Sequence, residues 1–219
     1  AAAWAGAAAA AGAKFVAVSS DAVFTGPWMF HDEESECLCP SAEATSIRAA
    51  ETEILKSNSA ALIVRTNVFG WSPAAIGGWL ETTLATIEAH RPVVLDAIRH
   101  ATPILATDLA DILEKALAQD LSGIYHAAGA ERVSPLQFAQ RLAGQFNLPW
   151  LPIRREEALT ETPAGFGQGE CSLQTKKLRR DLCLPMPLLS EALDRLEAQQ
   201  WNGHRERLAP VASVQLRAA

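Results

Sequence analysis

The sequence predicts an α/β protein with a mostly parallel sheet and a small second lobe. Short apolar segments alternate with amphipathic helical patterns, an order that is typical of parallel strands joined by crossover helices. Irregular stretches rich in Pro and Gly lie between Gly70 and Thr102 and after Pro149. We expect these stretches to form a lobe over the carboxyl edge of the sheet, where open α/β sheets bind their ligands.

Each element follows from a local pattern. The alanines of 1–11 favour a helix that Gly12 ends. Apolar segments with polar ends predict buried strands at 14–20, 61–67 and 123–128, and PVVLDA predicts a shorter strand at 92–97. Helical patterns cover 41–56, 79–90, 108–119, 136–146, 175–181 and 188–200, and Ser134-Pro135 caps the fourth of them. The Pro-rich stretch 148–169 is predicted to be irregular.

Composition and charge exclude some classes of partner. The net charge is −6 without a basic run, so nothing favours nucleic acid or an anionic membrane. No apolar stretch approaches the roughly 20 residues that span a bilayer. The four cysteines lack the spacing of a zinc site, so we expect no metal, free thiols and a cytoplasmic location.

The segment VSSDAVFTG places Ser19, Ser20 and Asp21 at the carboxyl end of a predicted strand. Small polar residues often end a strand, so a functional interpretation needs matching segments downstream. The segment resembles the ST-D-x-VF-x-G signature of the extended short-chain dehydrogenase/reductases, especially the dTDP-4-dehydrorhamnose reductase-like (RmlD-like, sugar-nucleotide-binding) family. Four later segments resemble that family in the same order: LIVRTNVFG (62–70), ATPILATDLADIL (101–113), GIYHAAGAERVSPLQFAQRLA (123–143) and SLQTKKLRRDL (172–182) with LLSEALDRL (188–196).

The resemblance assigns roles to individual residues. Ser20 occupies the position of the Ser or Thr that polarises the substrate carbonyl. Ala44, four residues after Pro40, occupies the position of the tyrosine that donates the proton, and Arg48 that of the lysine that supports it. Alanine has no proton to donate, and losing a general acid typically slows a reaction about 10²–10⁴-fold. Arg48 keeps a positive charge that could still bind a ribose or a phosphate.

The resemblance also implies a fold, a cofactor and further binding residues. It implies a partial Rossmann-type domain at 1–73 and 105–130 and a substrate-binding lobe at 74–104 and 131–219. The family reduces the ketone of a nucleotide-linked sugar with hydride from the reduced form of its cofactor, NADP or NAD. Cofactor contacts are expected at Ser19, Arg48, Thr66 and Asn67, and substrate contacts at Asp21, Phe24 and Trp71.

A second departure concerns the cofactor. The family begins with a strand, a glycine-rich turn and a helix that receive the cofactor pyrophosphate, and nothing in this sequence matches them. The glycines at 165, 167 and 169 follow no predicted strand and are interpreted as a loop. We therefore expect an amino-terminally truncated member: either a fragment, or a chain whose first strands come from a partner. His31, in an acidic loop, is expected to be solvated.

Three hypotheses remain open. The chain is part of an NAD(P)-dependent reductase of a nucleotide-linked keto sugar. Alternatively, it is a non-catalytic ligand-binding or regulatory pseudoenzyme on the same fold, because Ala44 replaces the tyrosine. As a third hypothesis, it is an inert remnant whose open sheet edge predicts aggregation. A homodimer or a partner chain is left open.

Overall fold

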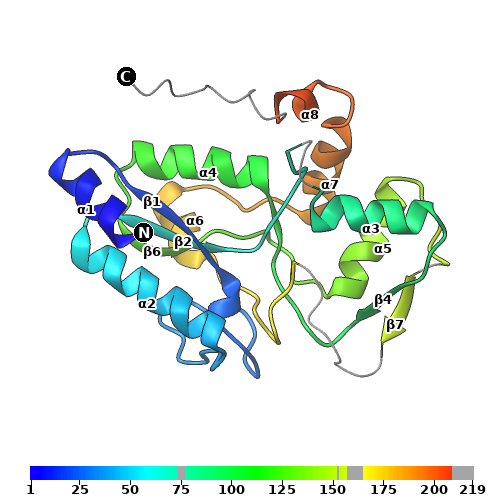
Figure 1. The fold of residues 1–219 in the computed structure, drawn as a ribbon, viewed down its shortest axis with the longest axis horizontal. Coiled ribbons are helices and arrows are strands. Elements are labelled where there is room, and N and C mark those ends of the chain that lie inside the picture. Colours follow the sequence, from blue (N-terminus) through cyan, green and yellow to red (C-terminus); the bar gives the residue numbers. More distant parts are fainter. Residues whose placement is uncertain (74–76, 152, 157–164, 209–219) are drawn as a thin grey trace, which may run out of the picture.

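The main sheet has three parallel strands. The computed structural model describes residues 1–73, 77–151, 153–156 and 165–208 of the 219. Strands β1 (Val16–Ser20), β2 (Leu62–Thr66) and β6 (Gly123–His126) pair in parallel in the order β1-β2-β6 (Figure 1). Parallel strands leave their carboxyl ends at one edge, so Ser20 and Thr66 lie opposite each other in the register.

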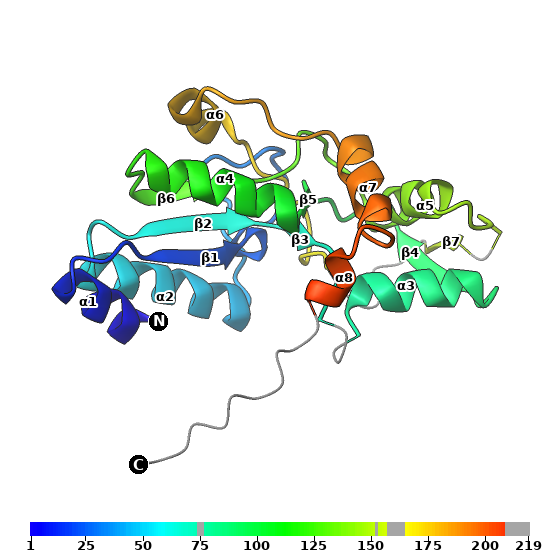
Figure 2. The same cartoon turned by 90° about the horizontal axis from the view of Figure 1, so that it is seen from above.

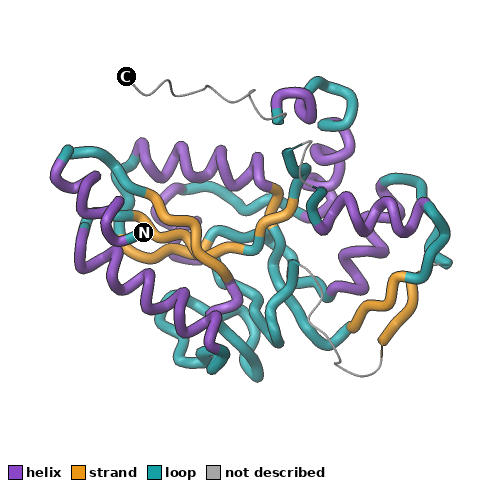
Figure 3. The backbone as a smooth tube through the Cα atoms, in the orientation of Figure 1, coloured by secondary structure: helices purple, strands orange, loops and turns teal. Residues whose placement is uncertain are grey.

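Helices cover both faces of this sheet (Figures 2 and 3). On one face lie α1 (Ala2–Ala10) and α2 (Ala42–Ser57), and on the other α4 (Ala106–Ala118) and α6 (Lys176–Leu182). Successive residues of a strand point to opposite faces, so β2 serves both layers. Its Ile63 packs with Ile54 of α2, whereas Leu62 and Val64 pack with helices α4 and α6.

The second lobe is built from helices α3 (Trp79–Glu88), α5 (Pro135–Gln145) and α7 (Leu189–Ala198) and the parallel pair β4 (Val93–Asp96) and β7 (Ile153–Glu156). Its core includes Phe69, Phe138, Leu142, Leu193 and Leu196. A capping box begins α5, because the Ser134 and Gln137 side chains each accept from the other residue's backbone N–H. Between lobe and sheet, β3 (Val68–Phe69) pairs with β5 (Ile104–Leu105).

Several elements differ from the sequence prediction. Strand β7 lies within the stretch predicted to be irregular, and the short β3–β5 pair and helix α8 (His204–Arg207) were not expected. Helix α6, which the predicted division assigns to the lobe, packs on the sheet through Leu178 and Leu182. The rest of that division stays a prediction, and residues 74–76, 152, 157–164 and 209–219, on which it partly rests, lie outside the described residues.

Strand β1 lies at one edge of the sheet. Among the described residues it pairs with β2 alone, and its Val18 side chain is 60% exposed. The backbone groups along its outer side therefore have no strand partner in the described part of the chain. No helix among the described residues is long and apolar enough to cross a membrane.

Candidate functional site

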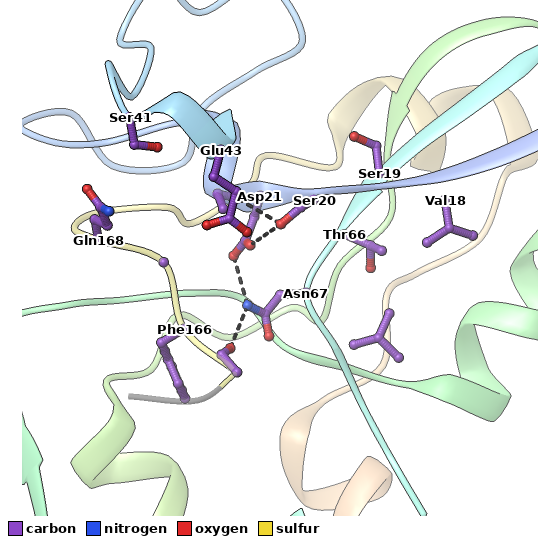
Figure 4. A pocket seen from close by; sticks show the side chains of 14 residues that line it. Val18, Ser19, Ser20, Asp21, Ser41, Glu43, Thr66, Asn67, Phe166 and Gln168 are labelled. Carbon is purple, nitrogen blue, oxygen red and sulfur yellow. Dashed lines mark hydrogen bonds between the residues drawn. The ribbon is translucent and has the colours of Figure 1, made fainter. Parts of the chain in front are cut away.

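A cleft of about 430 Å³ lies at the carboxyl ends of β1 and β2 (Figure 4). It combines four groups of residues: the end of β1 with the 3₁₀ turn η1 (Asp21–Val23), the start of α2, the connection from β2 to β3, and a wall from the loop 165–168. The lining residues are Val18, Ser19, Ser20, Asp21, Ala22, Ser41, Glu43, Thr66, Asn67, Val68, Gly165, Phe166, Gly167 and Gln168.

Ser20 ends β1 and caps η1. Its Oγ accepts a hydrogen bond from the Ala22 backbone N–H at 3.1 Å, so its own hydrogen stays available for donation. That hydrogen is directed at Asp21 Oδ1 across 3.4 Å, which is longer than an ordinary O–H···O bond. Thr66, opposite Ser20 in the register, is 4% exposed, and its Oγ1 has no hydrogen-bond partner among the described residues.

Asp21 is a buried carboxyl group, only 2% exposed. Asn67 Nδ2 donates to Asp21 Oδ2 at 3.0 Å and to the Gly165 carbonyl oxygen at 2.9 Å, so Asn67 links the sheet edge to the loop wall (Figure 4). Burial raises the pKa of Asp21 from 3.8 to about 7, and the hydrogen bonds from Asn67 and Ser20 offset only part of that rise.

The cleft carries acidic and neutral polar groups. Asp21 and Glu43 supply carboxyl groups, and the remaining polar lining consists of hydroxyl, amide and backbone groups. None of the described residues that line it is Lys, Arg or His. A buried anion needs a cation or several donors to offset its lost hydration. The lining therefore suits an uncharged polar group better than a diphosphate.

The structure does not bring the two remaining family positions to this cleft. Ala44 is 1% exposed and lies in the first turn of α2, where its N–H donates to Ser41 Oγ. The Arg48 guanidinium donates to the carbonyl oxygens of Cys39 at 2.8 Å and Val23 at 3.4 Å. Neither Ala44 nor Arg48 lines the cleft. The Arg48 side chain thus connects the loop after β1 to α2 by hydrogen bonds, which is a structural role.

Ser19 also has a structural partner. Its Oγ donates to Glu51 Oε1 at 2.6 Å. Arg65 donates to both oxygens of the same carboxylate, from Nε to Oε1 at 3.0 Å and from Nη2 to Oε2 at 2.7 Å. Both side chains of this ion pair are at least nine-tenths buried. The Ser19 hydroxyl is thus turned toward α2 and stabilises a buried ion pair.

Phe24 and Trp71, expected at the substrate, are packing residues in the structure. Phe24 is fully buried and stacks on His31 with ring centroids 4.8 Å apart. His31 is itself 2% exposed and bonds to Ser35 and the Glu170 carbonyl, so the expectation of a solvated histidine is wrong. The Trp71 Nε1–H donates to the Leu196 carbonyl at 2.9 Å within the lobe core. Neither Phe24 nor Trp71 lines the cleft.

Sequence reasoning missed three parts of the lining: Ser41, Glu43 and the wall 165–168. The glycines of the wall carried a signal, because glycine permits close approach. Gly165 has φ +81°, and an added Cβ there would lie 2.6 Å from the Trp79 ring. At Gly167 an added Cβ would lie 2.5 Å from Cys171 Sγ. Only glycine fits both positions without displacing these neighbours.

The cofactor that the family implies does not fit the described residues. A dinucleotide needs a glycine-rich turn that presents backbone N–H groups to its pyrophosphate, and the described residues contain none between a strand and a helix. Of the expected contacts, Arg48, Ser19 and Asn67 are engaged within the chain, which leaves Thr66. Among the described residues no group of three or more His, Cys, Asp or Glu could hold a metal ion.

A doubly covered parallel sheet with a cleft at its carboxyl edge defines a Rossmann-type α/β protein. Residues 1–200 match the model of the RmlD substrate binding domain, and the chain belongs to that family. The family and the Rossmann-type α/β fold with a parallel sheet, both predicted from the sequence, are thereby confirmed. No curated protein sequence matches the chain.

Solved structures share this fold. The dTDP-4-dehydrorhamnose reductase of Bacillus anthracis, in complex with NADP, is similar with a TM-score of 0.79 and 23% identity, over 89% of this chain and 69% of that chain. The dTDP-4-dehydrorhamnose reductase of Yersinia enterocolitica gives a TM-score of 0.76 and 18% identity over the same shares. That of Clostridium acetobutylicum gives 0.75 and 20%, over 90% of this chain and 69% of that chain. At these identities the likeness shows the fold alone.

Proposed function

We propose that this protein binds the sugar of a nucleotide-linked sugar in the cleft at the ends of β1 and β2. One observation carries the proposal: the cleft is lined by hydroxyl, amide and carboxyl groups, and its described lining residues include no cation. Such a lining offers hydrogen bonds to sugar oxygens, whereas the diphosphate would lie outside it. Membership of the RmlD substrate binding domain family supports a sugar nucleotide as the ligand class.

We propose further that this binding serves the reduction of a sugar ketone. In that reaction Ser20 faces the carbonyl oxygen, and NADP or NAD is the cofactor that the family implies. The family and the complex of the B. anthracis reductase with NADP support this proposal. A cytoplasmic location stays a prediction.

A second candidate is non-catalytic sugar-nucleotide binding. The observation that favours it is the environment of Ala44, which is 1% exposed and has no proton to give. Ser20 and Asp21 keep their places in the cleft although the tyrosine is absent. A protein that lost turnover and kept binding would show this combination.

Calorimetry with dTDP-, UDP- and GDP-linked sugars tests the binding. We expect one of these sugar nucleotides to bind. The Ser20→Ala substitution should lower the affinity for that sugar nucleotide more than the affinity for the matching nucleoside diphosphate. Ser46→Ala on the exposed side of α2, where among the described residues the hydroxyl bonds to the Ala42 carbonyl, is the matched control. Binding that is equal for Ser20→Ala and the unchanged protein would contradict the assignment of the cleft.

The absorbance of NADPH separates the two candidates. Consumption of NADPH in the presence of dTDP-4-dehydrorhamnose, lost in Ser20→Ala, supports the reductase. Tight binding of the sugar nucleotide with no consumption of NADPH or NADH supports the non-catalytic candidate. Absence of binding by any nucleotide-linked sugar would contradict both.

A further inference from the structure

Ser20 and Asp21 place two oxygen atoms side by side in the cleft. Ser20 Oγ and Asp21 Oδ1 are 3.4 Å apart, and both residues line the cavity (Figure 4). Ser20 Oγ accepts a hydrogen bond from the Ala22 N–H, and its own hydrogen is engaged only in the long 3.4 Å contact to Asp21 Oδ1, from which it can turn to a ligand. An oxygen that lies near both atoms could therefore meet two groups at once.

Asn67 fixes the orientation of the Asp21 carboxyl group. Its Nδ2 donates to Oδ2, so Oδ2 must act as an acceptor. When the carboxyl is neutral, its hydrogen is therefore carried on Oδ1, the atom beside Ser20. The neutral form has physical support, because burial raises the pKa of Asp21 to about 7 and no salt bridge among the described residues includes Asp21.

We propose that Ser20 and the neutral carboxyl group of Asp21 form a pair of hydroxyl donors that holds one carbonyl oxygen of the bound sugar. Asp21 thereby supplies the second hydrogen bond that a tyrosine would give at position 44. The proposal deepens the proposed function and rests on it, since it names the group of the sugar that the cleft selects. A carbonyl oxygen can accept from both donors, whereas a hydroxyl that accepts from both still has its own hydrogen to place, so the cleft favours a keto sugar over its alcohol while Asp21 is neutral.

Other titratable groups face Asp21 from the neighbouring elements. Glu43 of α2 lines the same cleft, and its side chain is exposed at the rim. Cys171, just beyond the wall 165–168, interacts with Asp21, and burial raises the pKa of its thiol to about 12, which keeps it uncharged. Asn67, from the β2–β3 connection, does not titrate. A variant of Glu43 is therefore the control for the assignment to Asp21.

Ionisation of Asp21 should switch this preference. The carboxylate is an acceptor facing another acceptor when a ketone is bound, whereas a ligand hydroxyl can donate to it. We therefore expect the affinity for dTDP-4-dehydrorhamnose, relative to dTDP-rhamnose, to fall about tenfold or more between about pH 5.5 and about pH 8.5. The ratio of the two affinities removes any titration that both ligands share.

The test is calorimetry with these two ligands on the full chain at both pH values. Asp21→Asn keeps a donor at the Oδ1 position that cannot ionise, because Asn67 orients the new amide oxygen toward itself. We expect this variant to prefer the ketone equally at both pH values, and Asp21→Ala to show no preference. Glu43→Gln should keep the pH dependence of the unchanged protein. Circular dichroism verifies that each variant is folded.

The possible outcomes separate a failure of the donor pair from a failure of the proposed function on which it rests. If dTDP-4-dehydrorhamnose and dTDP-rhamnose bind with a pH-independent ratio, the donor pair is refuted while sugar-nucleotide binding stands. If Glu43→Gln removes the pH dependence and Asp21→Asn keeps it, the assignment to Asp21 is overturned. If neither ligand binds at either pH, the donor pair and the proposed binding of these sugar nucleotides both fail.

Discussion

Replacing Asp21 by Asn should stabilise the protein above neutral pH. Burial raises the pKa of Asp21 from 3.8 to about 7, so the folded state holds a proton that the unfolded state releases between these values. The free energy of unfolding therefore falls as pH rises through this window. At about 1.4 kcal/mol for each pH unit, a window of about three units gives about 4 kcal/mol. Asn keeps the shape of the neutral carboxyl and cannot ionise.

The assay is chemical denaturation of both proteins across the pH range. We expect the variant and the unchanged protein to differ little at about pH 4 and by up to about 4 kcal/mol at about pH 8, with the variant the more stable. Because the protonation of His126 also changes the stability of both proteins, the two proteins must be compared with each other at each pH. Burial lowers its pKa to about 3, so its contribution to stability is lost as pH falls from about 6.5, a slope of opposite sign.

A difference that does not depend on pH would refute this reasoning. It would mean that Asp21 is ionised in the folded protein at ordinary pH, and the neutral donor proposed for the cleft would then be absent. Because His126 is common to both proteins, its titration cancels in the difference. The stability of the unchanged protein alone would be a poor test, since the two slopes oppose each other between about pH 4 and 6.5.

Four further substitutions test the scaffold, each by denaturation at neutral pH. Glu51→Ala should lower the free energy of unfolding by about 3–5 kcal/mol, because it leaves Arg65 buried without its partner. Glu53→Ala, on the same helix but in an exposed ion pair, should cost at most about 1 kcal/mol; equal losses would contradict the role of burial. Ser134→Ala should cost about 1 kcal/mol through loss of the helix cap, and no loss would show that the cap is dispensable. Ala44→Tyr should cost about 1–3 kcal/mol because the position is closed to solvent; unchanged stability with NADPH consumption would show instead that the site accepts a tyrosine.

The main sheet could be predicted because its strands have a purely local signal. LIVRT is buried at every position, and its run of three apolar residues is what a strand covered on both faces is expected to show. Strand β7 has the sequence IRRE, and Arg154 and Arg155 are exposed, so no apolar pattern marks it. Its pairing with β4 is decided by the packing of the lobe, which a local pattern does not contain.

The site, like the fold, was predictable from the sequence only where a local pattern marks its residues. Ser20 and Asp21 follow directly from their place at the end of a strand. The opposite wall is held by the bond from Asn67 to the Gly165 carbonyl, across 98 positions of the sequence. No periodicity or spacing encodes such a contact. The glycines at 165 and 167 signalled only that something comes close to the backbone there.

The placement of the signature residues explains how the family fold can persist without the tyrosine. Phe24 packs in the core, Ser19 and Arg65 meet at Glu51, and Arg48 holds the loop after β1, so these positions stabilise the scaffold. Substituting any of these residues should lower the free energy of unfolding. Position 44 is different, because alanine fills a closed site in the first turn of α2 and leaves no polar group unpaired. The sequence signature therefore predicts the fold better than the reaction, and the chemistry that we propose for this chain rests on Ser20 at the end of β1 and Asp21 at the start of η1.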